Sequence, residues 1–361
     1  MARALDLARK GLFTVSPNPM VGAVIIRNDV CVGEGFHRRA GDAHAEVNAL
    51  RDAGDKAHGA DLYVTLEPCC VQGRTPPCTE AVISAGIKRV FVGATDPNPD
   101  VCGNGIARLR EAGIEVIEGI QREEATWLNR AFNKWITTGI PWVTLKLAMT
   151  MDGKTAASTG KSQWITSEAI RQHVHVLRAA SDAIMVGSGT ANIDNPRLNV
   201  RGVEPLFEGG EFHAPLKVIV GSSVRLSPSS RILEDGETLV VTHGAEGTIR
   251  DPSKHPSLAY LNTPGSQTKV HVGELLKHLG GRSTRPVCSI LVEGGATLAT
   301  SMVREGLVDE LRLHIAPKLI GGDGLSVLHS LGIVSPDDAD MLQVVAINTY
   351  APDIEIIASF R

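Results

Sequence analysis

The stretch DLYVTLEPCCVQGRTPPC, residues 61–78, decides how the first part of this chain folds. Residues 61–66 are mostly apolar or β-branched and predict a strand that delivers Cys69 at its C-terminal end. Cys78 opens a predicted helix over residues 78–85, where N-terminal backbone amides stabilise a thiolate. The segment between the two thiols contains glycine and proline, so it can turn tightly and bring Cys78 back to Cys69.

A histidine and a glutamate upstream complete the pattern. His44 and Glu46 stand at the start of a predicted helix over residues 46–53, whose dipole disfavours a protonated imidazole. One imidazole and two thiolates, from His44, Cys69 and Cys78, suit a tetrahedral Zn²⁺ and leave its fourth position for water, as in catalytic sites. Glu46 is not needed as a ligand. It is placed to take a proton from the metal-bound water and pass it to a leaving nitrogen, as in zinc nucleobase deaminases.

Other interpretations stay open from the residues alone. Taken singly, His44 could cap its helix and each cysteine could be an ordinary buried thiol. The general deaminase signature has two residues between its cysteines, whereas eight separate Cys69 from Cys78 here. A non-catalytic zinc module needs four protein ligands, and Cys70 is the only other thiol nearby. A deaminase of nucleic-acid bases with an RNA-binding second half would carry a basic, aromatic-bearing surface.

Composition argues against nucleic-acid and membrane partners. The net charge is −4 and aromatic residues make up 4% of the chain, which disfavours a nucleic-acid binder. No run approaches the roughly 18 apolar residues that a membrane helix needs. Six cysteines in 361 residues do not form a secreted disulfide framework, and thiolate ligation fits a reducing compartment. We therefore expect a cytoplasmic protein that acts on small molecules.

Strands and helices alternate along the chain, which predicts a layered α/β fold. The length favours two domains. A break at Thr138-Gly139-Ile140-Pro141 ends a helix, so we expect domains at residues 1–140 and 141–361. The pattern predicts strands at 21–26, 30–36, 61–66, 89–94, 114–118, 142–148, 183–186, 216–220, 239–242 and 289–292, helices at 46–53, 78–85, 105–112, 122–137, 167–178 and 296–304, an exposed connection at 244–267, and a β-rich end at 311–315 and 344–360.

The inserted sequence between the cysteines makes a resemblance specific. Residues 64–78 (VTLEPCCVQGRTPPC), the His44-Ala45-Glu46 motif, residues 18–22 (NPMVG) and residues 96–99 (DPNP) closely resemble the bifunctional riboflavin-biosynthesis family, in which a pyrimidine deaminase is fused to a reductase. The resemblance covers nearly the whole chain. It implies the zinc ligands and the proton shuttle already named. It also implies a cytidine-deaminase-like α/β/α domain followed by a dihydrofolate-reductase-like α/β domain.

The same resemblance implies substrate contacts in the first domain at Asn18, His37 and Arg74. An Asn amide can read both donor and acceptor edges of a pyrimidine, and an arginine suits a phosphate. Without the family, His37 would be taken for an exposed residue of a basic stretch. The chain departs from the family after the first ligand cysteine, where Cys70-Val71 replaces Ser-His. We expect the deaminase chemistry to survive this change, because the four core residues are intact.

The second half contains no intact G-x-G-x-x-G, so a Rossmann domain is not supported. It resembles instead the reductase half of the same family, which takes a hydride from NADPH. Substrate contacts are implied at Ser162, Arg178, Leu198, Arg201 and Glu293. Cofactor contacts are implied at Ala148, Trp164, Thr190, Asp194, Ser222, Gly295, Ala296, Thr297, Leu298, Ala299, Thr300 and Ser301.

Chemistry gives several of these residues a role. Two glycines that open a helix let backbone amides approach a cofactor phosphate. Arg178 and Arg201 could clamp a ribose phosphate. Reduction at the sugar C1 requires ring opening, so an acid–base group must lie near that carbon, and Lys146 and Glu293 are our candidates. The alternatives are a structural Lys146–Glu293 ion pair and, for Trp164, a half-buried core aromatic.

The resemblance implies a two-step activity. The first domain hydrolyses the 2-amino group of 2,5-diamino-6-ribosylamino-4(3H)-pyrimidinone 5′-phosphate and releases ammonia. The second reduces the ribosyl group with NADPH and gives 5-amino-6-ribitylaminouracil 5′-phosphate. The family also suggests a homo-oligomer, a dimer or tetramer.

Overall fold

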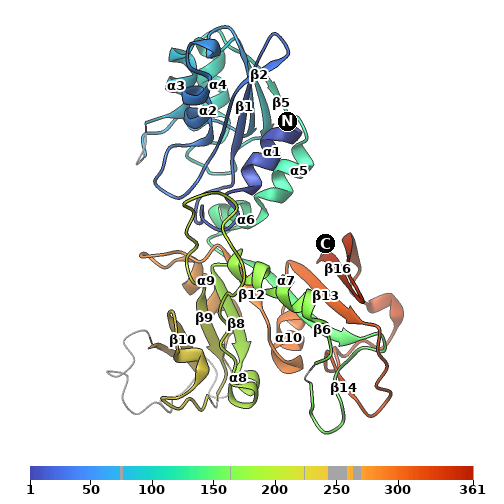
Figure 1. Cartoon of the computed structure of the whole chain (residues 1–361). Coiled ribbons are helices and arrows are strands. Elements are labelled where there is room, and N and C mark those ends of the chain that lie inside the picture. The colour runs from blue at the N-terminus through green and yellow to red at the C-terminus, as the bar shows by residue number, and fades with distance from the viewer. Residues whose placement is uncertain (74–75, 163, 223, 243–257, 263–269, 361) are drawn as a thin grey trace. The chain divides into compact units, whose positions relative to one another are not determined.

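The computed structural model describes residues 1–73, 76–162, 164–222, 224–242, 258–262 and 270–360. The chain divides into two compact units (Figure 1). The first, the N-terminal unit, comprises residues 1–140 together with two later segments, 204–213 and 284–288. The second, the C-terminal unit, comprises residues 141–203, 214–283 and 289–361. Arg74, an expected substrate contact, lies outside the described residues.

The N-terminal unit is built on a five-stranded sheet in the order β2-β1-β3-β4-β5. The expected hairpin of β1 and β2 is present, β1 also runs antiparallel to β3, and β3, β4 and β5 are mutually parallel. The parallel strands therefore end at one edge, where Leu66 and Ala94 lead into the loops that carry the site. The bounds are β1 Gly22–Arg27, β2 Val30–Phe36, β3 Asp61–Leu66, β4 Arg89–Ala94 and β5 Glu115–Glu118.

Helices cover both faces of this sheet (Figure 1). One face packs on α2, α3 and α4, and the other on α1 and α5. Glycines in the strands permit close approach of the helices: a Cβ at Gly22 of β1 would lie 1.9 Å from the carbonyl oxygen of Ala4 in α1, and one at Gly35 of β2 would lie 2.4 Å from that of Ala45 in α2. The bounds are α1 Ala2–Arg9, α2 Ala45–Ala53, α3 Cys78–Ser84, α4 Asn104–Glu111, α5 Arg122–Leu128 and α6 Arg130–Thr138.

The prediction of a single helix over residues 122–137 is wrong, because the structure has two helices, α5 and α6, that meet at Asn129. The side chain of Asn129 accepts a hydrogen bond from the Met20 backbone N–H at 2.8 Å and donates one to the Met20 carbonyl at 2.9 Å. This tertiary pairing holds the buried Asn129 outside helical geometry. Local periodicity could not reveal a partner 109 residues away.

The C-terminal unit is built on a nine-stranded sheet in the order β11-β10-β9-β8-β12-β6-β13-β16-β15. The first seven strands in that order, from β11 through β13, run parallel to one another. The last two, β16 and β15, add an antiparallel edge. The bounds are β6 Trp142–Thr150, β8 Ala183–Gly187, β9 Leu216–Val220, β10 Thr238–Thr242, β11 Leu258–Asn262, β12 Ser289–Val292, β13 Glu310–Ala316, β15 Leu342–Tyr350 and β16 Asp353–Phe360. A separate ribbon pairs β7 Lys154–Ala156 with β14 Leu325–Ser326.

Four α-helices accompany this sheet in the described part of the unit: α7 Glu168–Ala179, α8 Ser188–Asp194, α9 Val272–Gly280 and α10 Ala296–Arg304. The expectation of an exposed connection over 244–267 is corrected by β11, which pairs in parallel with β10. Residues 243–257 and 263–269 of that connection lie outside the described part of the chain. Among the described residues, every helix is too short or too polar to cross a bilayer.

Candidate active sites

Three potential metal ligands meet at the parallel edge of the first sheet. His44 is the N-cap of α2, Cys69 follows β3, and Cys78 is the first residue of α3. The Nδ1 atom of His44 lies 3.1 Å from Sγ of Cys78 and 3.5 Å from Sγ of Cys69, and the three ligand atoms all lie within 4.8 Å of one another. Three elements that are separate in sequence therefore bring one imidazole and two thiols to a point.

This donor set fits Zn²⁺. With Zn–S of about 2.3 Å and Zn–N of about 2.0 Å, a tetrahedral ion would separate its sulfur and nitrogen ligands by about 3.5 Å. The hydrogen bond between the two thiols lowers the pKa of Cys69, as His44 does further, and raises the pKa of Cys78, so one thiolate of the pair is favoured and Cys78 must release its proton to bind a metal. Among the described residues, the metal-ligand group contains these three and does not include Cys70. The fourth protein ligand that a closed structural site requires is thus not supplied by that thiol.

Glu46 lies beside the ligands without joining them. It stands in the first turn of α2, two residues after His44, and only 3% of its surface is exposed. Burial raises the pKa of its carboxyl to about 7, the negative charge of Cys69 acts in the same direction, and His44 opposes both. A buried carboxyl beside the ligand group can both accept and return a proton, which is what a deamination requires.

Asn18 and His37 form a second cluster in the same unit. His37 is 2% exposed, which overturns the interpretation of an exposed basic stretch. Its Nδ1 lies 3.3 Å from the Ala43 carbonyl, so Nδ1 carries the proton. Nε2 then accepts from the amide nitrogen of Asn18 at 3.0 Å. Burial lowers the pKa of His37 to about 4, so it stays neutral and fixes which end of the Asn18 amide remains open to a ligand.

Glu67, which the sequence analysis did not single out, organises the loop beside the metal group. It is 3% exposed and directly precedes Pro68-Cys69. One carboxylate oxygen accepts the backbone N–H groups of Asp96 and Gly103, and the other accepts that of Ile106. Burial, with the charges of Glu67 and Cys69, raises the pKa of Asp96 to about 6.

In the C-terminal unit, several expected cofactor residues gather at the C-terminal edge of the parallel strands. Thr190 follows β8, Ser222 follows β9, and Gly295 follows β12 as the N-cap of α10. A Cβ at Gly295 would lie 3.4 Å from the Thr190 hydroxyl, so these two segments touch. Ligands of open α/β sheets bind at this edge, and a bare helix N-terminus suits a cofactor phosphate.

The expected contacts in the 295–301 stretch are not equivalent. The side chains of Leu298, Ala299 and Thr300 are buried, whereas the first turn from Gly295 to Thr297 is at the surface or close to it. A cofactor would therefore meet the backbone and side chains of that first turn. Ala148, near the C-terminal end of β6, is partly buried at the same edge of the sheet, and Ser301 lies farther along the helix.

Arg178 and Glu293 form a bidentate ion pair. Nε of Arg178 donates to one Glu293 oxygen at 2.6 Å and Nη2 donates to the other at 3.0 Å, and both side chains are largely buried. The third guanidinium nitrogen donates to the Asn199 carbonyl at 3.1 Å. The expected phosphate clamp is therefore not formed by the fork of Arg178, which Glu293 already occupies. Arg201 is exposed, and its Nη2 lies 3.4 Å from Nε2 of His175.

Lys146 belongs to the same cluster. Burial lowers the pKa of its ammonium, Glu293 opposes that effect, and the charge of Arg178 adds to it. The pKa of Glu293 is lowered overall because Arg178 outweighs the effect of burial. The alternative interpretation, a structural Lys146–Glu293 ion pair, differs from the structure, in which Glu293 pairs with Arg178 and Lys146 interacts with both charges.

The remaining expected residues differ in exposure. Trp164 is 65% exposed, so the interpretation as a half-buried core aromatic is wrong, and its ring stacks under the guanidinium of Arg171. Leu198 is 3% exposed and adopts a left-handed conformation with φ of 51°. Asp194 ends α8 at the surface, and Ser162 is exposed.

Comparison with known proteins accounts for both units. Residues 1–94 match the family described as cytidine and deoxycytidylate deaminase zinc-binding region, and residues 141–356 match the RibD C-terminal domain. The chain is 43% identical over 362 residues to riboflavin biosynthesis protein RibD of Escherichia coli, covering 98% of this chain and 96% of that protein. It is 41% identical over 360 residues to the protein of the same name from Bacillus amyloliquefaciens, covering 99% and 95%.

Solved structures agree with these relatives. Acinetobacter baumannii RibD, form 1, superposes with a TM-score of 0.88 at 37% identity, covering 100% of this chain and 97% of that one. A Thermotoga maritima protein described as a diaminohydroxyphosphoribosylaminopyrimidine deaminase and 5-amino-6-(5-phosphoribosylamino)uracil reductase superposes with a TM-score of 0.86 at 35% identity, with the same coverage. The expected fold class, a deaminase-like domain followed by a reductase domain, is confirmed.

Proposed function

Because the chain belongs to the RibD family, the bifunctional zinc-dependent deaminases and NADPH-dependent reductases of riboflavin biosynthesis, we propose that its two units carry out successive steps on one phosphorylated pyrimidine. Residues 1–140 form the deaminase domain and residues 141–361 the reductase domain. The substrate is 2,5-diamino-6-ribosylamino-4(3H)-pyrimidinone 5′-phosphate, and the final product is 5-amino-6-ribitylaminouracil 5′-phosphate. The observation that carries the deaminase assignment is the group of His44, Cys69 and Cys78 with buried Glu46 beside it.

In the deaminase step, each residue has a limited task. His44, Cys69 and Cys78 would hold zinc, which would lower the pKa of a bound water and so supply a nucleophile at neutral pH. Glu46 accepts the proton of the water that attacks C2 of the pyrimidine. It then delivers that proton to the 2-amino nitrogen, which leaves as ammonia. Asn18, held by His37, contacts the ring with its amide oxygen, and Arg74 contacts the phosphate.

The Glu46→Gln variant tests this assignment. We expect it to retain stoichiometric zinc and to lose ammonia release by about 10²–10⁴-fold, because the amide cannot accept the proton. NADPH oxidation by the same chain, supplied with the deaminated intermediate, serves as an internal control and should be unchanged. Undiminished ammonia release from this variant would remove Glu46 from the mechanism.

In the reductase step, NADPH supplies a hydride when it is bound at the sheet edge. The ribosyl ring opens as its ring oxygen takes a proton and the electron pair of the C1–O bond, while the lone pair of the attached nitrogen forms a C1=N bond. Hydride addition to C1 returns that pair to nitrogen, so one proton is consumed for each hydride. Lys146 is the proton donor, with Glu293 beside it. Arg201, Ser162 and Leu198 line the sugar phosphate, and Arg178 holds Glu293 in place. Lys146→Met should abolish NADPH oxidation while ammonia release continues.

The protein assembles as a homo-oligomer through the edge strand β15. The apolar side chains of Met341, Val344, Val345 and Ile347 are 41–73% exposed on or beside this strand, which is the last of the nine-stranded sheet. Exposed apolar strand edges favour pairing with a second chain. Ile347→Glu should lower the mass measured by light scattering, and an unchanged mass would move the interface elsewhere. The thiolate ligands favour a cytoplasmic location.

A further inference from the structure

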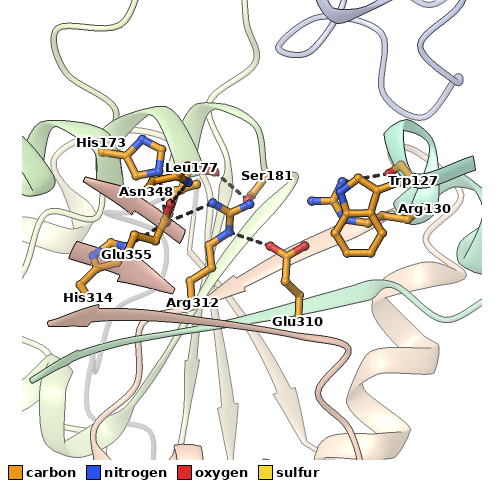
Figure 2. A network of polar contacts seen from close by, with 10 residues as sticks. All are labelled: Trp127, Arg130, His173, Leu177, Ser181, Glu310, Arg312, His314, Asn348 and Glu355. Atoms are coloured by element: carbon orange, nitrogen blue, oxygen red, sulfur yellow. Dashed lines mark hydrogen bonds and ion pairs between the residues drawn. The ribbon is translucent and has the colours of Figure 1, made fainter. Parts of the chain in front are cut away.

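A buried polar network lies on one face of the second sheet, where α7 meets β13, β15 and β16 (Figure 2). Its centre is Glu355 of β16, which is fully buried. Glu355 accepts hydrogen bonds from Arg312 at 3.1 Å and from Asn348 at 2.9 Å, and His173 of α7 lies 3.3 Å away. With so many donors, the carboxylate of Glu355 is held in its ionised form, and its pKa is lowered despite burial.

His314 of β13 faces this carboxylate and is also fully buried (Figure 2). The two residues are register partners across the antiparallel β13–β16 pair, and Nε2 of His314 lies 3.2 Å from the Glu355 oxygen. An ionised carboxylate can only accept, so Nε2 carries the hydrogen. Nδ1 is then a bare acceptor, and it is buried with no hydrogen-bond partner. An unused buried acceptor is costly unless a donor reaches it.

Arg312 lies on this face, but it already donates to Glu310 and Glu355; Lys146 is a second cationic side chain on the same face. In the parallel β6–β13 pair, Lys146 is aligned with Arg312, and Ala148 is aligned with His314. Aligned residues of parallel strands point to the same face, and residues two apart on a strand share it, so Lys146 and His314 are diagonal neighbours. The charge of Lys146 is felt at His314, whose pKa is lowered by burial first and by Lys146 as well. Ala148 between them has no side chain long enough to separate them.

We propose that His314 is a positioning residue for the reductase: Glu355 fixes its tautomer, and a change of the Lys146 rotamer brings the ammonium to Nδ1, the acceptor that has no hydrogen-bond partner in this structure. This inference depends on the proposed function, because it takes Lys146 as the proton donor. The ammonium is thereby held toward the sugar ring oxygen. On its other sides Lys146 faces Glu293 at the end of β12 and Arg178 of α7. A neutral acceptor at His314 stabilises the charged form of Lys146 without competing for its proton.

Two substitutions of similar size separate this role from a structural one. His314→Gln keeps a donor near the position of Nε2, toward Glu355, and loses the Nδ1 acceptor. His314→Asn keeps an acceptor near the position of Nδ1 and loses the contact with Glu355. We expect the Gln variant to lose about 10- to 100-fold in reductase kcat with little change in KM, because a hydrogen bond to a charged group is lost. The Asn variant should stay within a few-fold of the unmodified chain.

The pH profile gives a second readout. In the Gln variant, the alkaline limb of kcat should move to lower pH, because the ammonium of Lys146 has lost a stabilising partner, whereas the Asn variant should keep the limb in place. Each variant is assayed for NADPH binding by fluorescence, and ammonia release by the other unit serves as a control. Equal losses in both variants, or a larger loss in Asn, would overturn the proposal.

A measurement on the unsubstituted side chain covers the case in which a variant fails to fold. In ¹⁵N-histidine spectra of the full chain, the Nδ1 resonance of His314 should be that of an unprotonated acceptor and should shift in Lys146→Met. A protonated Nδ1 would contradict the inference. If Lys146→Met still reduces the substrate, Lys146 is not the proton donor and the proposed function is wrong at that residue. If Lys146→Met abolishes reduction but His314→Gln leaves it unchanged, only the positioning role of His314 is wrong.

Discussion

The carboxylate of Glu67 is the clearest point at which one atom exchange should destabilise the deaminase unit. It accepts three backbone N–H groups, those of Asp96, Gly103 and Ile106, at 3.0–3.2 Å, and it is buried. In Glu67→Gln, one oxygen becomes an amide nitrogen that must face an N–H group. The least costly orientation keeps the oxygen that serves Asp96 and Gly103 and gives up the bond from Ile106.

The magnitude follows from the kind of bond that is lost. A hydrogen bond to a charged group contributes about 1.5–3 kcal/mol, and the remaining two bonds weaken because their acceptor becomes neutral. We expect the free energy of opening of the 96–106 loop to fall by about 2–4 kcal/mol. Glu80→Gln is the matched control, because Glu80 pairs with Arg108 at the surface, where solvent screens the pair and leaves it little effect on stability.

Native-state hydrogen exchange in increasing urea measures this quantity directly. Amide protection at Gly103 and Ile106 should decrease in the Glu67 variant and stay unchanged in the Glu80 variant, with zinc content equal in both. The KM of the deaminase should rise, since the loop begins beside the metal ligands. If protection at both amides stayed within about 0.5 kcal/mol of the unmodified chain, the carboxylate would not be what holds this loop.

Three further changes test other parts of the structure. Gly105→Ala would place a methyl group 2.0 Å from the carbonyl oxygen of Pro68, so it should displace the cysteine loop and reduce zinc content, measured by elemental analysis. Arg178→Met leaves Glu293 buried without its partner and should cost about 3–5 kcal/mol in thermal unfolding of the reductase unit at neutral pH. The pKa of Glu293 is lower in the folded state than in the unfolded state. The stability that the ion pair contributes is therefore fully present above the unfolded pKa of about 4.3 and is lost as the pH falls through the folded pKa. The difference in stability between Arg178→Met and the unmodified chain should shrink in acid. Phe207→Ala removes the ring contact with Phe36 of β2, whose centroid lies 5.3 Å away. Because Phe36 belongs to the deaminase sheet, the KM of the deaminase should rise, and the kcat and KM of the reductase should stay unchanged.

The prediction for Phe207 depends on a part of the fold that the sequence did not reveal. Residues 204–213 follow the expected substrate residue Arg201 in sequence, yet they belong to the N-terminal unit. Phe207 packs on Phe36, and Phe212 on Phe13, in edge-to-face contacts. The segment is rich in glycine and acidic residues and has no periodicity, so no local pattern indicates that its two aromatic rings are anchors.

The grouping of three potential metal ligands was predictable because their residue types and spacing are themselves the signal. A histidine two residues before a glutamate at a helix start, and cysteines after a strand and before a helix, define a metal group before any contact is known. The supporting residues have no such signature. Glu293 could be named from its Glu-Gly-Gly motif, but its partner Arg178 lies 115 residues away, and the pairing depends on how α7 crosses the sheet.

The same distinction decides what the Cys70-Val71 departure means for this chain. Cys70 is partly buried and lies outside the group formed by His44, Cys69 and Cys78. Val71 is 39% exposed. The change therefore alters what surrounds the metal and leaves the three donors and Glu46 in place. Because the reactivity of a zinc-bound water is set first by its donors and by the proton acceptor beside it, deamination should persist. Any cost should appear in the KM of the substrate, since a neighbour of the metal can affect how the pyrimidine is seated without affecting how the water is activated.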